Sequence, residues 1–165
     1  MHNASTHFTL RPMAETDAAA VASLVRAAFA AQPVPVEPPP SALRLTEADV
    51  REHLRQGGGM VAIASAELAG SIMWAVQDGA LHVARLAVLP GQRRQGIASA
   101  LLHAAEQAAR AAGLQRITLG TRLALTGNRH LFAAHGFVET TLQTHPGYTE
   151  PTWVELEKRL HSFHR

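Results

Sequence analysis

The segment from Leu89 to Gly113 constrains the fold more than any other part of the sequence, because it joins a strand-like run to a long helix. The apolar run Ala80–Leu89 stops at a proline, and an alanine-rich stretch begins at Gly96. Apolar residues then recur at helical spacing on one face, namely Ile97, Leu101, Ala104, Ala105, Ala108 and Ala112. Gly113 is well placed to end the helix. The segment therefore predicts a strand followed by an amphipathic helix.

The remaining periodicities predict how this unit is embedded in the chain. Strands are expected at residues 8–13, 60–67, 68–79, 80–89, 115–122, 136–143 and 152–160, and helices at 16–31, 46–57, 96–113 and 128–135. Thr16 is a candidate N-cap of the first helix, and Thr46 with Asp49 resembles a capping pair in the second. This order implies a mixed α/β sheet with helices on its faces. No repeat or second core is visible, so we expect one domain over residues 1–165.

Composition argues against several classes of protein. The chain has 165 residues, of which 47% are hydrophobic and 17% are charged, as in a globular protein. A formal net charge of +2 and the lack of a Lys/Arg-rich block argue against nucleic acid as a partner. No apolar run approaches the roughly 18 residues of a membrane helix, and the start MHNASTHFTLRP lacks a signal-peptide pattern. We therefore expect a cytoplasmic protein that binds no membrane.

Two residue types bear on metal chemistry. The chain has no cysteine, which excludes disulfides, thiolate metal ligands and a cysteine nucleophile. Its ten histidines are scattered, without an HxxxH or HxH pair. No metal site is expected.

A proline-rich segment, Gln32–Ser41, separates the first two helices. Five prolines in ten residues forbid a helix and favour a stiff, extended loop. The segment is either a spacer or a loop on the substrate side of a site.

The start of the central helix suits an anionic ligand. The N–H groups of Gln95–Ser99 lack intrahelical partners and point out of the positive end of the helix. Gly96 has no Cβ, so a phosphate can approach the main chain, and Arg93 and Arg94 can add positive charge. The alternative is an ordinary turn with solvated charges. A nucleotide P-loop does not fit, because no Lys-Ser/Thr pair follows Gly96. A dinucleotide-binding turn does not fit either, because no Gly-x-Gly-x-x-Gly pattern is present.

Three features together resemble the Gcn5-related N-acetyltransferase (GNAT) superfamily. Arg93-x-x-Gly96-x-Ala98, after a strand ending in LAV and a proline, resembles the family's cofactor motif Gln/Arg-x-x-Gly-x-Gly/Ala. The segment from Asn128 to Phe137 (NRHLFAAHGF) resembles its second cofactor segment, a short helix followed by Gly-Phe. The order of the elements agrees as well. The resemblance covers nearly the whole chain.

This resemblance implies a fold and a cofactor. The fold would be a mixed, mostly antiparallel sheet of six to seven strands flanked by about four helices, with a splayed strand pair that holds acetyl-CoA. The pantetheine arm would pair with the main chain of the strand, and the pyrophosphate would lie on the helix start. Asn128 could instead be an ordinary helix N-cap. The residues implied in cofactor binding are Leu86, Ala87, Val88, Arg93, Arg94, Gln95, Gly96, Ile97, Ala98, Ser99, Asn128 and Phe132.

The resemblance also implies direct acetyl transfer, in which a neutral amine attacks the thioester without a covalent intermediate on the protein. Phe132 occupies the position where many members carry the tyrosine that protonates the thiolate. The only tyrosine, Tyr148, is therefore a candidate catalytic residue, although HPGYTEPT also reads as a simple turn. His82, where the family often has a glutamate, is the candidate base, or else an ordinary strand residue.

The expected function is an acetyl-CoA-dependent N-acetyltransferase that acts on a primary amine of a small molecule or peptide, without a metal. Arg85 and Arg122, near strand ends, could bind an acidic acceptor or could simply be solvated. The main alternative is a CoA-binding regulatory or partner module with little activity. A homodimer is possible, because family members often form one.

Overall fold

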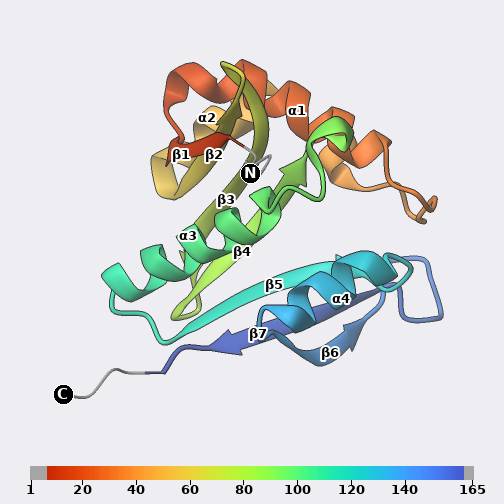
Figure 1. Ribbon diagram of the computed structural model, residues 1–165. Helices are drawn as coiled ribbons and strands as arrows, with labels where there is room; N and C mark the ends of the chain where they lie inside the picture. The colour runs from red at the N-terminus through yellow and green to blue at the C-terminus, as the bar shows by residue number, and fades with distance from the viewer. Residues whose placement is uncertain (1–6, 162–165) are drawn as a thin grey trace, which may run out of the picture.

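The computed structural model describes residues 7–161 and contains one seven-stranded sheet with helices on both faces (Figure 1). The strands are β1 (Phe8–Pro12), β2 (Gly58–Ala64), β3 (Glu67–Gln77), β4 (Ala80–Val88), β5 (Arg116–Arg122), β6 (Val138–Gln143) and β7 (Trp153–Arg159). The α-helices are α1 (Ala18–Ala30), α2 (Glu47–Gln56), α3 (Ile97–Ala111) and α4 (Thr126–Ala134). Three short 3₁₀ helices, η1 (Glu15–Asp17), η2 (Ser41–Arg44) and η3 (Pro90–Gln92), lie in the connections.

The strand order is β1-β2-β3-β4-β5-β7-β6, and every neighbouring pair is antiparallel except β4 and β5. The predicted fold class, a mixed and mostly antiparallel sheet with four flanking helices, is confirmed. Within residues 7–161, no helix has the length and apolar character needed to cross a membrane.

Two hydrophobic cores lie on opposite faces of the sheet. One core contains α1 and α2 with residues of β2–β4, and the other contains α3 and α4 with residues of β2–β5 and β7. The predicted stripe of α3 is partly wrong: Leu102 and Ala109 are buried, Ala108 is only partly buried, and Ala112 is exposed. The buried face of α3 is rotated from the predicted stripe toward Leu102 and Ala109. Ala112 is the C-cap residue, where the chain leaves the helix.

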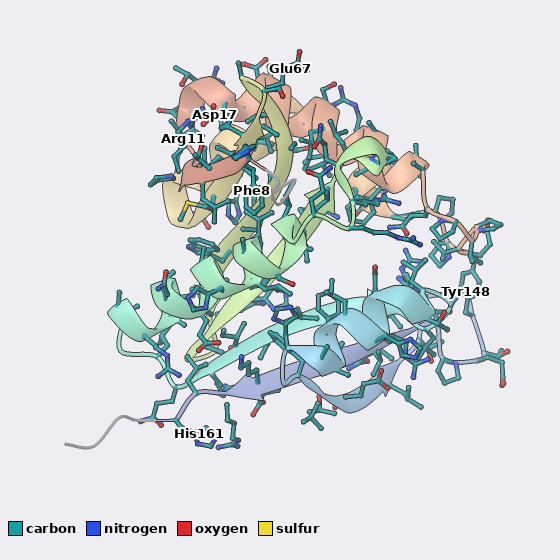
Figure 2. The ribbon with its side chains drawn as sticks, viewed as in Figure 1. Phe8, Arg11, Asp17, Glu67, Tyr148 and His161 are labelled. Carbon is teal, nitrogen blue, oxygen red and sulfur yellow. The ribbon has the colours of Figure 1, made fainter. Side chains whose placement is uncertain are left out.

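The starts of the first two helices show one correct and one wrong prediction. Thr46 and Asp49 form the predicted capping box, with the Asp49 N–H donating to Thr46 Oγ1 over 3.1 Å. Thr16 does not cap the first helix. Helical structure begins at Glu15, and Asp17 accepts the Ala14 N–H and pairs with Arg11, each over 2.8 Å (Figure 2). Thr16 therefore lies inside the first helical turn rather than before it, and the hydrogen bond from Arg11 lowers the pKa of Asp17.

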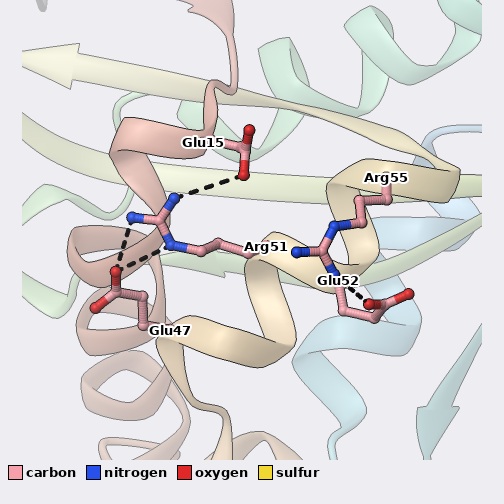
Figure 3. A network of polar contacts seen from close by, with 5 residues as sticks. All are labelled: Glu15, Glu47, Arg51, Glu52 and Arg55. Carbon is pink, nitrogen blue, oxygen red and sulfur yellow. Dashed lines mark hydrogen bonds and ion pairs between the residues drawn. The ribbon is translucent and has the colours of Figure 1, made fainter.

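The outer face of α2 carries ion pairs, as Figure 3 shows. Arg51 contacts Glu47 over 2.8 Å and Glu15 over 3.6 Å, and so links α2 to the turn before α1. Arg55 pairs with Glu52 one turn away. These side chains are exposed and solvent screens each ion pair, so the pairs add little to the stability of the fold. This face is therefore a solvated surface.

The sheet opens where β4 meets β5. Main-chain pairing between these parallel strands is limited to Leu81 with Ile117 and His82 with Thr118, and Figure 1 shows the strands diverging beyond that point. The register of β4 against β3 shifts between Ala84 and Ala87, and Arg85 has a φ of 56°. A β-bulge of this kind bends the strand, and pairing with β3 resumes at Ala87 while pairing with β5 does not. The predicted splayed strand pair is thus present.

Helix α3 connects the two parts of the sheet on either side of this opening. Its first residue, Ile97, packs against β3 because Gly70 has no side chain; a Cβ there would lie 2.9 Å from Ile97 Cγ2. Glu106 of α3 accepts a hydrogen bond from Lys158 of β7 over 2.7 Å, and Lys158 lowers the pKa of Glu106. The start of α3 is therefore held beside the bulge.

Candidate active site

Two cavities meet at the splayed strands. The first, here called the α3 cavity, has a volume of about 510 Å³ and lies between the end of β4, the start of α3 and the start of α4. The second, the β5 cavity, measures about 570 Å³ and is lined chiefly by residues of β4, β5 and β7. The lining shared by both consists of Phe29, Leu86, Leu125, Asn128 and Phe132.

The α3 cavity brings together nearly all the residues predicted to bind a cofactor. Its lining includes Leu86, Ala87, Val88, Arg93, Arg94, Gly96, Ile97, Ala98, Ser99, Asn128 and Phe132. Gln95 lies in the same turn and is half-buried, but it does not line the cavity.

The start of α3 is open and electrically positive toward this cavity. Gly96, the N-cap residue, has a φ of 84°, and a Cβ there would meet no atom within 4 Å. The first helical hydrogen bond runs from the Ala100 N–H to Gly96 O over 3.0 Å, so the N–H groups of residues 97–99 precede the helical ladder. An anionic oxygen is the ligand that such a helix start favours.

The two arginines of the turn play different parts. Arg93 donates from Nε to Val88 O over 3.2 Å and from Nη2 to Ala28 O over 3.3 Å. It therefore fixes the turn to β4 and α1, a role that the sequence did not reveal. Arg94, with a φ of 66°, is exposed at the mouth of the cavity. Arg94 is the arginine placed to add charge.

Helix α4 forms the opposite wall. It begins at Thr126, so Asn128 is its third residue, and the alternative that Asn128 caps this helix is wrong. Asn128 Nδ2 instead faces Thr121 Oγ1 on β5 at 3.5 Å. Ser99 Oγ lies 2.9 Å from His135 Nε2, which ties the start of α3 to the end of α4. Burial lowers the pKa of His135, so its neutral form is favoured.

His82 lies in the β5 cavity, at the last paired position of β4 and β5. Its Nδ1 is 2.9 Å from Thr118 Oγ1. Burial lowers the pKa of His82, opposed by the weaker attraction of Glu155. The imidazole is therefore neutral at pH 7 and able to accept a proton.

The lining residues that the sequence analysis missed include Thr118, Glu155 and Trp153. Glu155 pairs in register with Gly120, and Trp153 with Arg122, so all lie on the same face as His82. A Cβ on Gly120 would come within 3.0 Å of the Trp153 ring, so this glycine makes room for the indole. The signal for these residues was the strand alternation, which becomes informative only when the pairing register is known.

The rim of the β5 cavity is formed by two loops. Arg122 donates to Pro38 O over 2.6 Å, and Tyr148 Oη donates to Glu37 Oε1 over 3.5 Å. Figure 2 shows the position of Tyr148. The proline-rich segment thus reaches β5 and the β6–β7 loop, which favours the substrate-side reading over a spacer. Tyr148 is 40% exposed and lines neither cavity, so it lies apart from His82.

Phe132 separates the two cavities. It is buried, lines both, and meets Phe137 edge-on with ring centroids 6.0 Å apart. In the described part of the chain, no group of three His, Cys, Asp or Glu residues is placed to hold a metal ion.

Comparison with known proteins agrees with this geometry. The chain resembles the ribosomal-protein-S18-alanine N-acetyltransferase of Escherichia coli, with a TM-score of 0.77, 17% identity and coverage of 96% of this chain and 97% of the other. It also resembles the PaiA N-acetyltransferase of Thermoplasma acidophilum in complex with coenzyme A (TM-score 0.76, 16% identity, coverage 93% and 99%). A GNAT family acetyltransferase of Elizabethkingia anophelis with acetyl-CoA bound matches with a TM-score of 0.65 and 19% identity, over 93% and 98% of the two chains.

At these identities the likeness to solved structures shows the fold. No curated protein matches the sequence significantly. The sequence pattern of the Acetyltransferase (GNAT) family, however, matches residues 21–137, a range that includes the turn before α3 and the Gly-Phe pair after α4. The chain therefore belongs to the GNAT family and is an acetyltransferase.

Proposed function

We propose that the α3 cavity binds acetyl-CoA and that the β5 cavity binds a primary amine of a small molecule or peptide. The observation that carries this proposal is the open helix start beside the end of β4, which no longer pairs with β5. The N–H groups of Arg94–Ser99 would hold the pyrophosphate, and the main chain of Leu86–Val88 would pair with the pantetheine amides. Acetyl-CoA supplies the acetyl group as a thioester.

The residues of the β5 cavity would handle the protons. His82, neutral and near the splay, would take the ammonium proton so that the free amine can attack. Phe132 cannot donate a proton, so solvent or another group would protonate the departing thiolate. The prediction that Tyr148 is catalytic stays a prediction, and its hydrogen bond to Glu37 places it at the rim.

Three further expectations stay predictions: a single domain over residues 1–165, a homodimer and a cytoplasmic location. One sheet contains strands from residue 8 to residue 159, which supports a single domain.

Two measurements on the wild-type chain test the proposal. Isothermal titration would measure the Kd of CoA and acetyl-CoA, and a free-thiol assay over a panel of amines would measure turnover. Binding together with amine-dependent thiol release supports the enzyme. Tight binding without turnover on any amine favours the CoA-binding module.

We predict that Phe132→Tyr is tolerated, because the ring lines both cavities and the added hydroxyl can point into open space. The Kd of CoA should stay within about threefold of the wild-type value, a smaller change than the gain or loss of one good hydrogen bond would cause. Phe137→Tyr is the matched control, since Phe137 lies in the core and outside both cavity linings. Thermal unfolding should show a loss of about 1–3 kcal/mol for Phe137→Tyr and little loss for Phe132→Tyr.

Turnover of the Phe132→Tyr variant answers a second question. A higher kcat identifies thiolate protonation as the missing element, and an unchanged kcat shows that another donor supplies the proton. A destabilisation equal to that of Phe137→Tyr would contradict the placement of Phe132 at the cavities.

A further inference from the structure

We propose that the amine acceptor carries an anionic group, a carboxylate or a phosphate, which Arg85 and Arg122 bind in the β5 cavity. The inference rests on the proposed function and narrows its substrate class. Both arginines line this cavity: Arg85 lies at the bulge of β4, and Arg122 is the last residue of β5.

Neither arginine has a carboxylate partner within the described residues. Arg85 Nη2 donates to Ser41 Oγ over 3.0 Å, and Arg122 Nη1 donates to Pro38 O over 2.6 Å, so both bind neutral acceptors. The ion pairs of residues 7–161 involve other cations, including Arg11, Arg51 and Arg129. Asp49 and Glu37 attract the two guanidinium groups only from a distance.

Burying the two guanidinium groups without a carboxylate partner costs free energy when no ligand is bound. Both side chains are half-buried, and loss of solvent lowers the pKa of each guanidinium group. A partly desolvated cation gains from an anion that restores its interactions. The planar guanidinium matches carboxylate and phosphate oxygens with two parallel hydrogen bonds.

The opposite end of the cavity suits an amine. His82 and Glu155 line it, and Glu155 lies in register with Gly120, two residues before Arg122 on the same face of β5. Thr118, the partner of His82, lies two residues further, so the two ends are separated by roughly 13 Å along the strand. The cavity is therefore acidic or neutral near His82 and basic near Arg85 and Arg122.

This polarity favours a ligand with a cation and an anion over a purely cationic one. The groups that face the cavity include two arginines but one carboxylate, and His82 and His145 both have pKa values lowered by burial. A polyamine would place a second positive charge near Arg85 and Arg122 and would be repelled. The floor formed by Trp153 would pack against the apolar chain between the two ligand charges.

The first experiment measures acceptor binding without depending on turnover. CoA-loaded protein would be titrated with ω-amino acids from glycine to 6-aminohexanoate, and each compound would be compared with its own carboxamide. O-phosphoethanolamine against ethanolamine tests phosphate, and spermidine tests a polycation. We expect at least one anionic amine to bind about 10- to 100-fold more tightly than its neutral analogue. Equal binding of every pair, or a preference for spermidine, overturns the inference.

The second experiment uses variants of the two arginines. In Arg85→Gln and Arg122→Gln, the Kd and KM for the anionic amine should rise about 10- to 100-fold, while those for the carboxamide change less than about twofold. Arg122→Lys keeps the positive charge but cannot form two parallel hydrogen bonds, so its Kd and KM for the anionic amine should lie between those of wild type and Arg122→Gln. Arg159→Gln is the control, because this arginine has a side chain 82% exposed and lies outside the cavity. An equal loss for both ligands overturns the inference.

The two hypotheses can fail separately. A chain that does not bind acetyl-CoA contradicts the proposed function. A chain that binds acetyl-CoA and acetylates neutral amines as well as anionic ones contradicts only the assignment of Arg85 and Arg122.

Discussion

Replacing Gly96 with glutamate is expected to raise the Kd of CoA and acetyl-CoA at least about a hundredfold, a loss of roughly 2.7 kcal/mol. The new carboxylate would occupy the open space in front of the α3 N-terminus, where the pyrophosphate is proposed to lie. It would both block the site and repel a ligand of the same charge. Isothermal titration measures the effect, and circular dichroism checks that the fold survives.

Two variants separate this effect from backbone strain. Gly96→Ala meets the same left-handed φ of 84° without the charge, so its affinity should fall far less. Gly113→Glu places a glutamate at another exposed glycine with a φ of 74°, at the far end of α3, and should leave CoA affinity unchanged. Unchanged affinity in Gly96→Glu would refute the pyrophosphate site.

His82→Gln is expected to lower kcat/KM by about 10²- to 10⁴-fold while the Kd of acetyl-CoA changes little. Glutamine can keep the hydrogen bond to Thr118 but cannot accept the ammonium proton at neutral pH. Steady-state kinetics over a range of pH, with titration of acetyl-CoA, measures both effects.

The pH profile of the wild type provides the sharper test of His82. Burial lowers the pKa of this histidine, so the active, neutral form persists below the usual histidine value of about 6.5. Activity should fall as the pH drops through this lowered pKa, and the acidic limb should disappear in His82→Gln. Thr118→Val is the control, because it keeps the imidazole and so should keep the limb. A limb that survives in His82→Gln would assign the proton transfer to another group.

The α3 cavity could be predicted from the sequence because its signals are local. Gly96, Arg94 and the apolar residues of α3 lie within about twenty residues, and one helix start brings them together. Contacts between distant segments were not predictable from this pattern. The hydrogen bonds from Arg93 to Val88 and Ala28 depend on how α1 packs against the end of β4.

The limit of prediction from the sequence is clearer for the β5 cavity. Glu155 and Thr118 join His82 only through the pairing of β4 with β5 and of β5 with β7, which crosses the order of the chain. Each strand could be predicted by itself, but a shift of one residue in register would turn these side chains to the other face. The prediction that Thr16 is an N-cap was wrong because helical structure begins one residue earlier, at Glu15, where Asp17 accepts the Ala14 N–H.

The short pairing between β4 and β5 also has a consequence for cooperativity. Two residue pairs join the main chains of β4 and β5, and side-chain contacts such as Glu106–Lys158, Ser99–His135 and Arg122–Pro38 add to the connection between β1–β4 and β5–β7. A molecule bound along Leu86–Val88 and α4 would add a further connection between these halves. Occupancy of the α3 cavity would then determine how cooperatively the two halves unfold. The free energy of unfolding would therefore rise with the ligand concentration.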